Sequence, residues 1–307
     1  YAFENIEFHE LIDRLYDVNL FKFLLSIIIL IVACIVRSKR LKYLAAPIDK
    51  NISTHHLFGA TMIGYFGNGI LFFRLGEVLK SYAIAQGKKI KPLESFGLIM
   101  LERVIDALSI FVLLLISLPF LPLENVTIRY WIIGFVVVTT TFIGVLFIFR
   151  ALNWDTMLDR INFINKPIKH RIIVLIDKIY NGLELLFKTK YKLEIFVSTF
   201  FIWLCYFLMT KWLIDACNID LNLFDNFILL IMGAIIISIP ALPGGLGTYE
   251  AGITFIMANL FLVPKDLALT YAIVSHTSNY LPYIIIGFIY FIRSGIKINA
   301  VKNDSSI

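Results

Sequence analysis

An apolar stretch is interrupted at 238–252 by two prolines and a cluster of glycines, and this break constrains the fold more than any other feature. Pro240 and Pro243 lack the backbone N–H that a regular helix uses, so a continuous helix cannot pass through them. The glycines that follow permit left-handed backbone and the close approach of another group. An unpaired backbone N–H or C=O is costly in hydrocarbon, so the break is expected to be buried in protein or to line a polar cavity. A tight loop at the membrane surface is the alternative interpretation.

The composition places this break in a membrane protein. The chain of 307 residues is 59% hydrophobic and 16% charged, whereas a soluble domain is about 45–50% apolar and about 25% charged. These values predict an all-α polytopic membrane protein, a helical bundle with re-entrant or broken helices. The net charge of +6 does not indicate nucleic acid as a partner, because the basic residues lie between apolar spans. The three cysteines have no metal-ligand spacing, and neither a metal nor a cofactor is expected.

The apolar spans and the charges between them predict a topology. Full spans are expected at about 20–36, 93–118, 129–149, 193–214 and 267–292. By the positive-inside rule the basic segments 37–40 and 150–192 and the C-terminus are cytoplasmic, while the acidic segment 1–19 is outside. Apolar residues recur at helical spacing within 150–192, which predicts an amphipathic helix on the inner leaflet. The sequence starts at Tyr1 and not at Met, so we expect a truncated N-terminus on a single transmembrane domain, 1–307.

A second interrupted segment lies at 55–73, where an apolar run contains several glycines. The segment after it is basic, with Lys80, Lys88 and Lys89. A full crossing at 55–73 would put these lysines outside, against the positive-inside rule. A re-entrant hairpin that returns to the cytoplasm removes the conflict, and we predict that arrangement.

Two of the full spans carry polar faces. Glu102 and Asp106 are four residues apart and share a helix face next to Arg103. Ionisable residues at this depth are costly unless they are paired or face a cavity. The alternative is an Arg103–Asp106 ion pair that only stabilises the packing of the bundle. His276 and Asn279 share a face of the last span, where His276 has either a proton-relay role or a hydrogen-bonded structural role.

The two interrupted segments suggest two weakly repeated halves. Glu77 follows one break and precedes Glu102, while Glu250 follows the other and precedes His276 at nearly the same separation. Broken helices at corresponding positions are a pointer to a midplane site in transporters. Glu250 has no cation near it in the sequence, so we expect it to face a cavity. Both breaks, and the two polar faces, are predicted to border one shared cavity.

Four sequence motifs carry a family resemblance. They are Gly-Tyr-Phe-Gly-Asn-Gly (64–69), Arg74-Leu-Gly-Glu77, Leu101-Glu-Arg-Val-Ile-Asp106 and Pro243-Gly-Gly-Leu-Gly-Thr-Tyr-Glu250. Over about 20–293 the chain resembles the membrane domain of the lysylphosphatidylglycerol synthase/flippase family. The resemblance implies a stand-alone flippase-like protein of a prokaryotic plasma (inner) membrane, with a further hydrophobic helix before the first one seen here. The sequence has no counterpart of the family's soluble aminoacyl-transferase domain, so aminoacylation is not expected.

The function expected from these features is that of a lipid flippase or lipid transporter, which carries a headgroup across about 30 Å of hydrocarbon. The candidate substrate-binding and translocation residues are Asn68, Arg74, Glu77, Glu102, Arg103, Asp106, Gly244, Gly245, Tyr249, Glu250, His276 and Asn279. The guanidinium groups suit a phosphate, and the carboxylates suit a cationic headgroup or a proton. No catalytic signature is present, so an enzyme is not expected. An intramembrane lipid- or glycan-transfer enzyme and an ion-coupled small-solute transporter are the alternatives. The expected partner is a membrane lipid, with self-association into a homo-oligomer left open.

Overall fold

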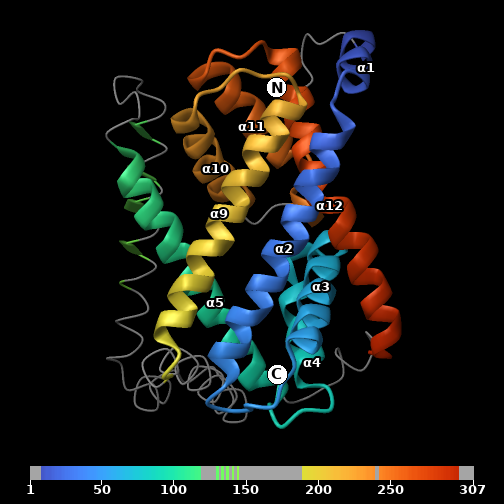
Figure 1. Ribbon diagram of the computed structural model, residues 1–307, viewed down its shortest axis with the longest axis vertical. Helices are drawn as coiled ribbons and strands as arrows, with labels where there is room; N and C mark the ends of the chain where they lie inside the picture. Colours follow the sequence, from blue (N-terminus) through green and yellow to red (C-terminus); the bar gives the residue numbers. More distant parts are fainter. Residues whose placement is uncertain are drawn as a thin grey trace, which may run out of the picture.

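Figure 1 shows a computed structural model of the chain, a bundle in which the elements run up and down its long axis. The structure describes residues 8–118, 189–238 and 242–296, together with short helical pieces between 129 and 144. Within these residues every regular element is a helix, so the predicted all-α fold is confirmed.

Four long helices form the frame of the bundle: α2 (Leu20–Ala45), α5 (Pro92–Ser117), α9 (Lys192–Ala216) and α12 (Lys265–Ser294). Among the described residues, α2 and α9 are the helices long and apolar enough to cross a membrane by length and composition. These two helices pack along each other over most of their length. At about 1.5 Å per residue, the 26 residues of α2 exceed the thickness of the hydrocarbon layer, about 30 Å.

The exterior of the bundle is apolar in the way that hydrocarbon requires. One face of α2 exposes large apolar side chains at intervals of three or four residues, at Phe21, Leu24, Ile28, Val32 and Ile35. The outer faces of α9 and α12 also expose large apolar residues, Phe196, Phe200, Leu204, Ile285, Phe288 and Ile292 among them. An apolar exterior of this extent is unsuited to water. It is the exterior of an integral membrane protein.

The sequence interpretation of residues 37–40 as a loop after a span ending at Val36 is wrong. Helix α2 continues through them to Ala45. Arg37 and Arg40 are buried, and both form ion pairs with Asp106 of α5. Arginine and lysine are good helix formers, and the carboxylate of Asp106 compensates the charges that would otherwise force this segment out of the bundle.

Helices α3 (Thr54–Ile70) and α4 (Gly76–Ala85) form a hairpin joined by the 3-10 turn η1 (Phe72–Arg74). The two helices pack closely because glycines face each other where they cross. A Cβ on Gly67 would lie 2.6 Å from the Cα atom of Gly76, which no packing allows. Figure 1 shows this hairpin confined to the half of the bundle that holds the end of α12.

A second hairpin consists of α10 (Leu223–Ser238), the 3-10 turn η3 (Pro243–Gly245) and α11 (Thr248–Leu260). It occupies the other half of the bundle (Figure 1). The turns of the two hairpins touch each other in the middle of the molecule. Arg74 of η1 donates a hydrogen bond to the carbonyl of Ile237 at the end of α10. The Tyr280 hydroxyl of α12 donates to the carbonyl of Gly69 at 3.2 Å.

Residues 8–16 form helix α1 (Phe8–Tyr16), which the sequence analysis did not predict. Its Arg14 forms an ion pair with Asp266 at 3.1 Å, and its Leu11 packs on Leu269, so α1 is attached to the start of α12. The predicted amphipathic helix of 150–192 and the residue Pro240 lie outside the described residues, as does most of the predicted span at 129–149.

Candidate functional site

A cavity of about 350 Å³ lies where the turns of the two hairpins meet, a volume typical of small-molecule sites. One part of its wall is charged and comes from α2, α4 and α5. Another part is apolar and comes from α9 and α10. Tyrosines and polar side chains of α12 also line the cavity. The charged part consists of Arg37, Glu77, Arg103 and Asp106, and the apolar part includes Met209, Leu229, Leu230, Ala234 and Ile237.

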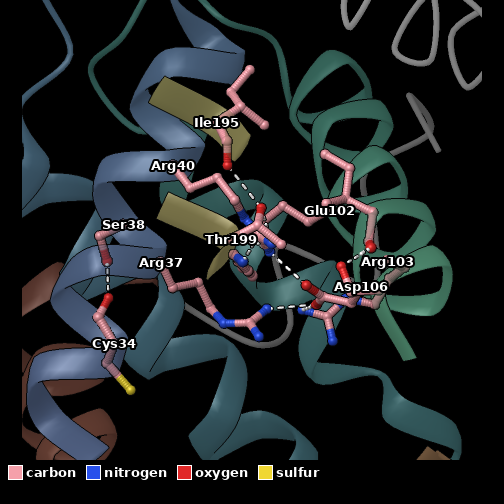
Figure 2. Close-up of polar contacts among 12 residues, drawn as sticks. Cys34, Arg37, Ser38, Arg40, Glu102, Arg103, Asp106, Ile195 and Thr199 are labelled. Atoms are coloured by element: carbon pink, nitrogen blue, oxygen red, sulfur yellow. Dashed lines mark hydrogen bonds and ion pairs between the residues drawn. The ribbon is translucent and has the colours of Figure 1, made fainter. Parts of the chain in front are cut away.

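Asp106 is the centre of the charged wall. Its carboxylate accepts a hydrogen bond at 2.7 Å from Arg37 and another at 2.7 Å from Arg40. Figure 2 shows the two arginines reaching from α2 toward this one carboxylate on α5. Arg103, three residues earlier on α5, lies 3.7 Å from the same carboxylate. The predicted Arg103–Asp106 contact is therefore present but is the longest of the three.

Glu102 lies behind this wall and does not line the cavity. Its carboxylate is fully buried and receives the ammonium group of Lys80 at 2.5 Å, with Arg40 at 3.7 Å. Lys80 is itself 2% exposed, although the sequence analysis grouped it with the basic cytoplasmic residues. Removal of either partner would leave an uncompensated buried charge, so this pair holds α4 against α5.

The charges around the cavity do not balance. The cations in this region are Arg37, Arg40, Arg74, Lys80 and Arg103, and the carboxylates are Glu77, Glu102, Asp106 and Glu250. With His276 counted as neutral, five positive groups against four negative groups leave an excess of one positive charge. Arg103 lines the cavity with its side chain 30% exposed, and its Nε–H has no hydrogen-bond partner within the described residues. An anion placed beside Arg103 would reduce the cost of the excess positive charge around the cavity.

The turn η1 brings Arg74 and Glu77 to the cavity. Phe73 and Arg74 both have left-handed backbone, with φ of 54° and 56°. This conformation is uncommon for residues other than glycine and costs about 1–3 kcal/mol for each of them. Arg74 uses its guanidinium group to bind the end of α10, where a cation is favoured by the helix dipole. Glu77, in the first turn of α4, is 9% exposed and accepts a long hydrogen bond of 3.4 Å from Asn68.

The turn η3 brings Gly244, Gly245 and the start of α11 to the opposite side. Gly244 and Gly245 have φ of 67° and 78°, the left-handed region that the glycines were expected to provide. Glu250 accepts a hydrogen bond from the backbone N–H of Gly247 at 2.7 Å, as a capping carboxylate does. Tyr249 contacts the Ser275 hydroxyl at 3.2 Å.

His276 joins these elements. Its Nδ1 atom lies 2.5 Å from the carboxylate of Glu250, and its Nε2 atom lies 2.9 Å from the carbonyl oxygen of Gly244. The expectation that Glu250 faces the cavity is wrong, because Glu250 does not line it and is instead bound to His276, which does. Glu250 and His276 are 26 residues apart in the sequence. An interpretation based on charges close in sequence therefore could not predict this contact.

The structure brings the candidate residues together to a large extent. Those that line the cavity are Asn68, Arg74, Glu77, Arg103, Asp106, Gly244, Gly245, Tyr249, His276 and Asn279. Glu102 and Glu250 do not line it; Glu250 contacts the lining residue His276, and Glu102 contacts Lys80 and Arg40. Sequence reasoning missed Arg37 and Arg40. Their spacing of three places them on one helix face, and the carboxylates of 102 and 106 required partners, so the signal was present in the sequence.

A model of one protein family, described as the lysylphosphatidylglycerol synthase TM region, matches residues 1–287 of the chain. No curated protein and no solved structure matches it.

Proposed function

Because the chain belongs to the family of the lysylphosphatidylglycerol synthase TM region, we propose that it moves a lipid between the two leaflets of a membrane. The family is a membrane domain associated with lipid flippase and synthase function. The observation that carries the proposal is the cavity between the two hairpin turns, which has a charged wall and an apolar wall. A phospholipid has the same two chemistries, a charged headgroup and apolar chains.

The position of the cavity supports translocation over simple binding. It lies where two hairpins from opposite ends of the bundle meet, so a headgroup within it would be near the middle of the bilayer. We infer that α3–α4 and α10–α11 are re-entrant in the membrane. Broken segments that meet in this way are a feature of transporters with a midplane site.

The charge of the cavity selects the class of headgroup. Its excess positive charge favours a lipid with net negative charge over a zwitterionic or cationic one. Arg103 is the group expected to hold the phosphate, because it lines the cavity with its side chain 30% exposed and guanidinium suits phosphate oxygens. Arg37 and Arg40 are already engaged by Asp106, and Arg74 by the end of α10.

A reconstitution experiment tests this function. The protein is placed in vesicles of phosphatidylethanolamine and phosphatidylglycerol with a trace of NBD-labelled phosphatidylglycerol, and dithionite bleaches only the label in the outer leaflet. The fraction of label that is bleached is expected to exceed the fraction bleached in protein-free vesicles, where only the outer leaflet is accessible. Bleaching of labelled phosphatidylglycerol is also expected to be faster than bleaching of NBD-labelled phosphatidylcholine. Bleaching equal to that of protein-free vesicles for both lipids would contradict the proposal.

Arg103→Gln provides the residue-level test. Removal of a charge-assisted contact worth about 1.5–3 kcal/mol is expected to slow translocation of the anionic lipid by at least about tenfold. The matched control is Arg14→Gln, which removes an arginine whose ion pair with Asp266 is remote from the cavity. Wild-type rates in Arg103→Gln would remove Arg103 from the headgroup site.

A further inference from the structure

We propose that Glu250 and His276 together hold one removable proton, and that loss of this proton frees the η3 turn from the wall of the cavity. The proposal rests on the proposed function and deepens it, since it links lipid movement to a proton. The pair is buried, with Glu250 at 9% and His276 at 6% exposure.

The hydrogen bonds of His276 require the proton. A carbonyl oxygen only accepts, so the contact of Nε2 with Gly244 at 2.9 Å requires a hydrogen on Nε2. The contact of Nδ1 with the Glu250 carboxyl oxygen at 2.5 Å is too short for two lone pairs, so it also contains a hydrogen. That hydrogen belongs either to an imidazolium facing a carboxylate or to a carboxylic acid facing a neutral imidazole. Both forms hold one proton more than a neutral imidazole beside a carboxylate.

Loss of the proton leaves one hydrogen for two acceptors. A neutral imidazole has a single N–H, while the carboxylate of Glu250 and the carbonyl of Gly244 both need a donor. The hydrogen stays with the carboxylate, because hydrogen bonds to charged groups are the stronger ones. Nε2 then presents a lone pair to the Gly244 carbonyl, and this contact becomes repulsive. Gly244 and Gly245 line the cavity, so the change at His276 acts directly on its wall.

The surroundings of the pair make the proton and the lipid interdependent. From α11 and α12 the titratable groups that face it are Tyr249 and Tyr280, whose ring centroids lie 5.0 Å and 5.7 Å from that of His276. The other charged or titratable groups of the same cavity are Tyr65 of α3, Arg74 of η1, Glu77 of α4, Arg37 of α2, Arg103 and Asp106 of α5, Tyr206 of α9, and Tyr271 and Tyr283 of α12. The deprotonated pair carries one negative charge and the protonated pair carries none. An anionic headgroup in the cavity therefore favours the protonated pair, and by reciprocity the proton favours the headgroup.

Nitrogen NMR of the histidine-labelled full chain in phosphatidylglycerol nanodiscs tests the proton site without transport. The His276 signals are those that disappear in His276→Gln. Between about pH 5 and about pH 9, Nε2 is expected to be protonated at the acidic end and bare at the alkaline end, with the remaining hydrogen on Nδ1. In Glu250→Gln an amide replaces the carboxylate and needs no proton, so Nε2 is expected to stay protonated throughout. An Nε2 that stays protonated throughout in the wild type would overturn the proposal.

Translocation of NBD-labelled phosphatidylglycerol in the vesicles described above tests the link to lipid. The wild-type rate is expected to fall by up to about tenfold per pH unit above the NMR midpoint, the limit for one proton. The control is His55→Gln, because His55 contacts Tyr290 far from the cavity, and it is expected to keep the wild-type profile. A pH-independent wild-type rate would overturn the link. If the wild type moves no lipid at any pH, the proposed function fails while the NMR result still decides the proton site.

Discussion

Asp106 accepts hydrogen bonds from Arg37 and Arg40, two buried cations on the same face of α2. Glu102 does the same for Lys80 one turn away. These carboxylates therefore hold α2, α4 and α5 together, and the burial of the cations paired with them depends on them. At the scale of single residues, the charged wall both stabilises the bundle and forms the proposed headgroup site.

Asp106→Asn tests the contribution of the Asp106 carboxylate to the stability of the bundle. Loss of one partner from a buried ionic network costs about 3–5 kcal/mol, so the variant is expected to unfold at a clearly lower temperature in detergent, followed by tryptophan fluorescence. The matched control is Asp215→Asn, which breaks the Lys211–Asp215 pair with side chains about one third exposed. Such a surface pair is worth about 0–1 kcal/mol. Equal shifts in the two variants would show that the arginines of α2 do not depend on Asp106.

The difference between predicted and observed residues has a physical pattern. Arg103, Asp106 and His276 were identified because a polar side chain inside an apolar span is conspicuous in the sequence. Arg37 and Lys80 were assigned to surfaces because basic residues beside a span usually mark a cytoplasmic loop. Their burial depends on carboxylates far along the chain. The positive-inside rule considers only residues near a span in the sequence, so it does not take these distant carboxylates into account.

At the scale of elements, the two hairpins depend on glycine for different reasons. In the η3 turn glycine provides left-handed backbone, whereas in α3–α4 it provides close approach. The sequence showed that both segments are interrupted, because glycine and proline are visible breaks. It did not show that η1 would obtain its left-handed backbone from Phe73 and Arg74, which have no such preference. The equivalence of the two halves stays a prediction.

Gly76→Ala tests the close approach of α3 and α4. A Cβ at this position would enter the backbone of Gly64 and Asn68, and such overpacking typically costs about 1–3 kcal/mol. The thermal midpoint in detergent is expected to fall, with a matching loss of lipid translocation as the hairpin shifts. Gly233→Ala on α10 is the control for the thermal midpoint alone, because the added Cβ would lie 3.5 Å from Ile253, an ordinary contact, while Gly233 itself lines the cavity. A fall of the same size in both variants would contradict the role of Gly76 as a crossing point.

At the scale of the whole molecule, many lysines flank one end of the bundle. The end of α4 lies beside the end of α12, since Gln86 donates to the Ser294 carbonyl at 2.6 Å. The end of α2 lies beside the start of α9 through the rings of Tyr43 and Tyr191. Lysines flank these segments at 42, 50, 88, 89, 91, 190 and 192. We propose that this end is cytoplasmic, together with the C-terminus, in a plasma membrane.

Cysteine labelling tests the orientation. In a background without the three native cysteines, Lys88→Cys is expected to resist a membrane-impermeant thiol reagent added outside intact cells. Asp220→Cys, exposed in the loop at the opposite end, is expected to react readily. Both variants are expected to react after the cells are permeabilised. Ready labelling of position 88 in intact cells would overturn the re-entrant placement of α3–α4.

The lengths of the hairpin helices determine how far each part of the chain depends on the rest for its place in the membrane. Helix α4 has 10 residues and α11 has 13, well short of the roughly 20 that a helix needs to cross a bilayer independently. Neither has a stable position in lipid before its neighbours are present, because the open turn at its end would face hydrocarbon. The helices α2 and α9, by contrast, are long and apolar enough to cross a membrane. The hairpins that form the cavity therefore depend on the surrounding bundle for their place in the membrane, whereas α2 and α9 do not.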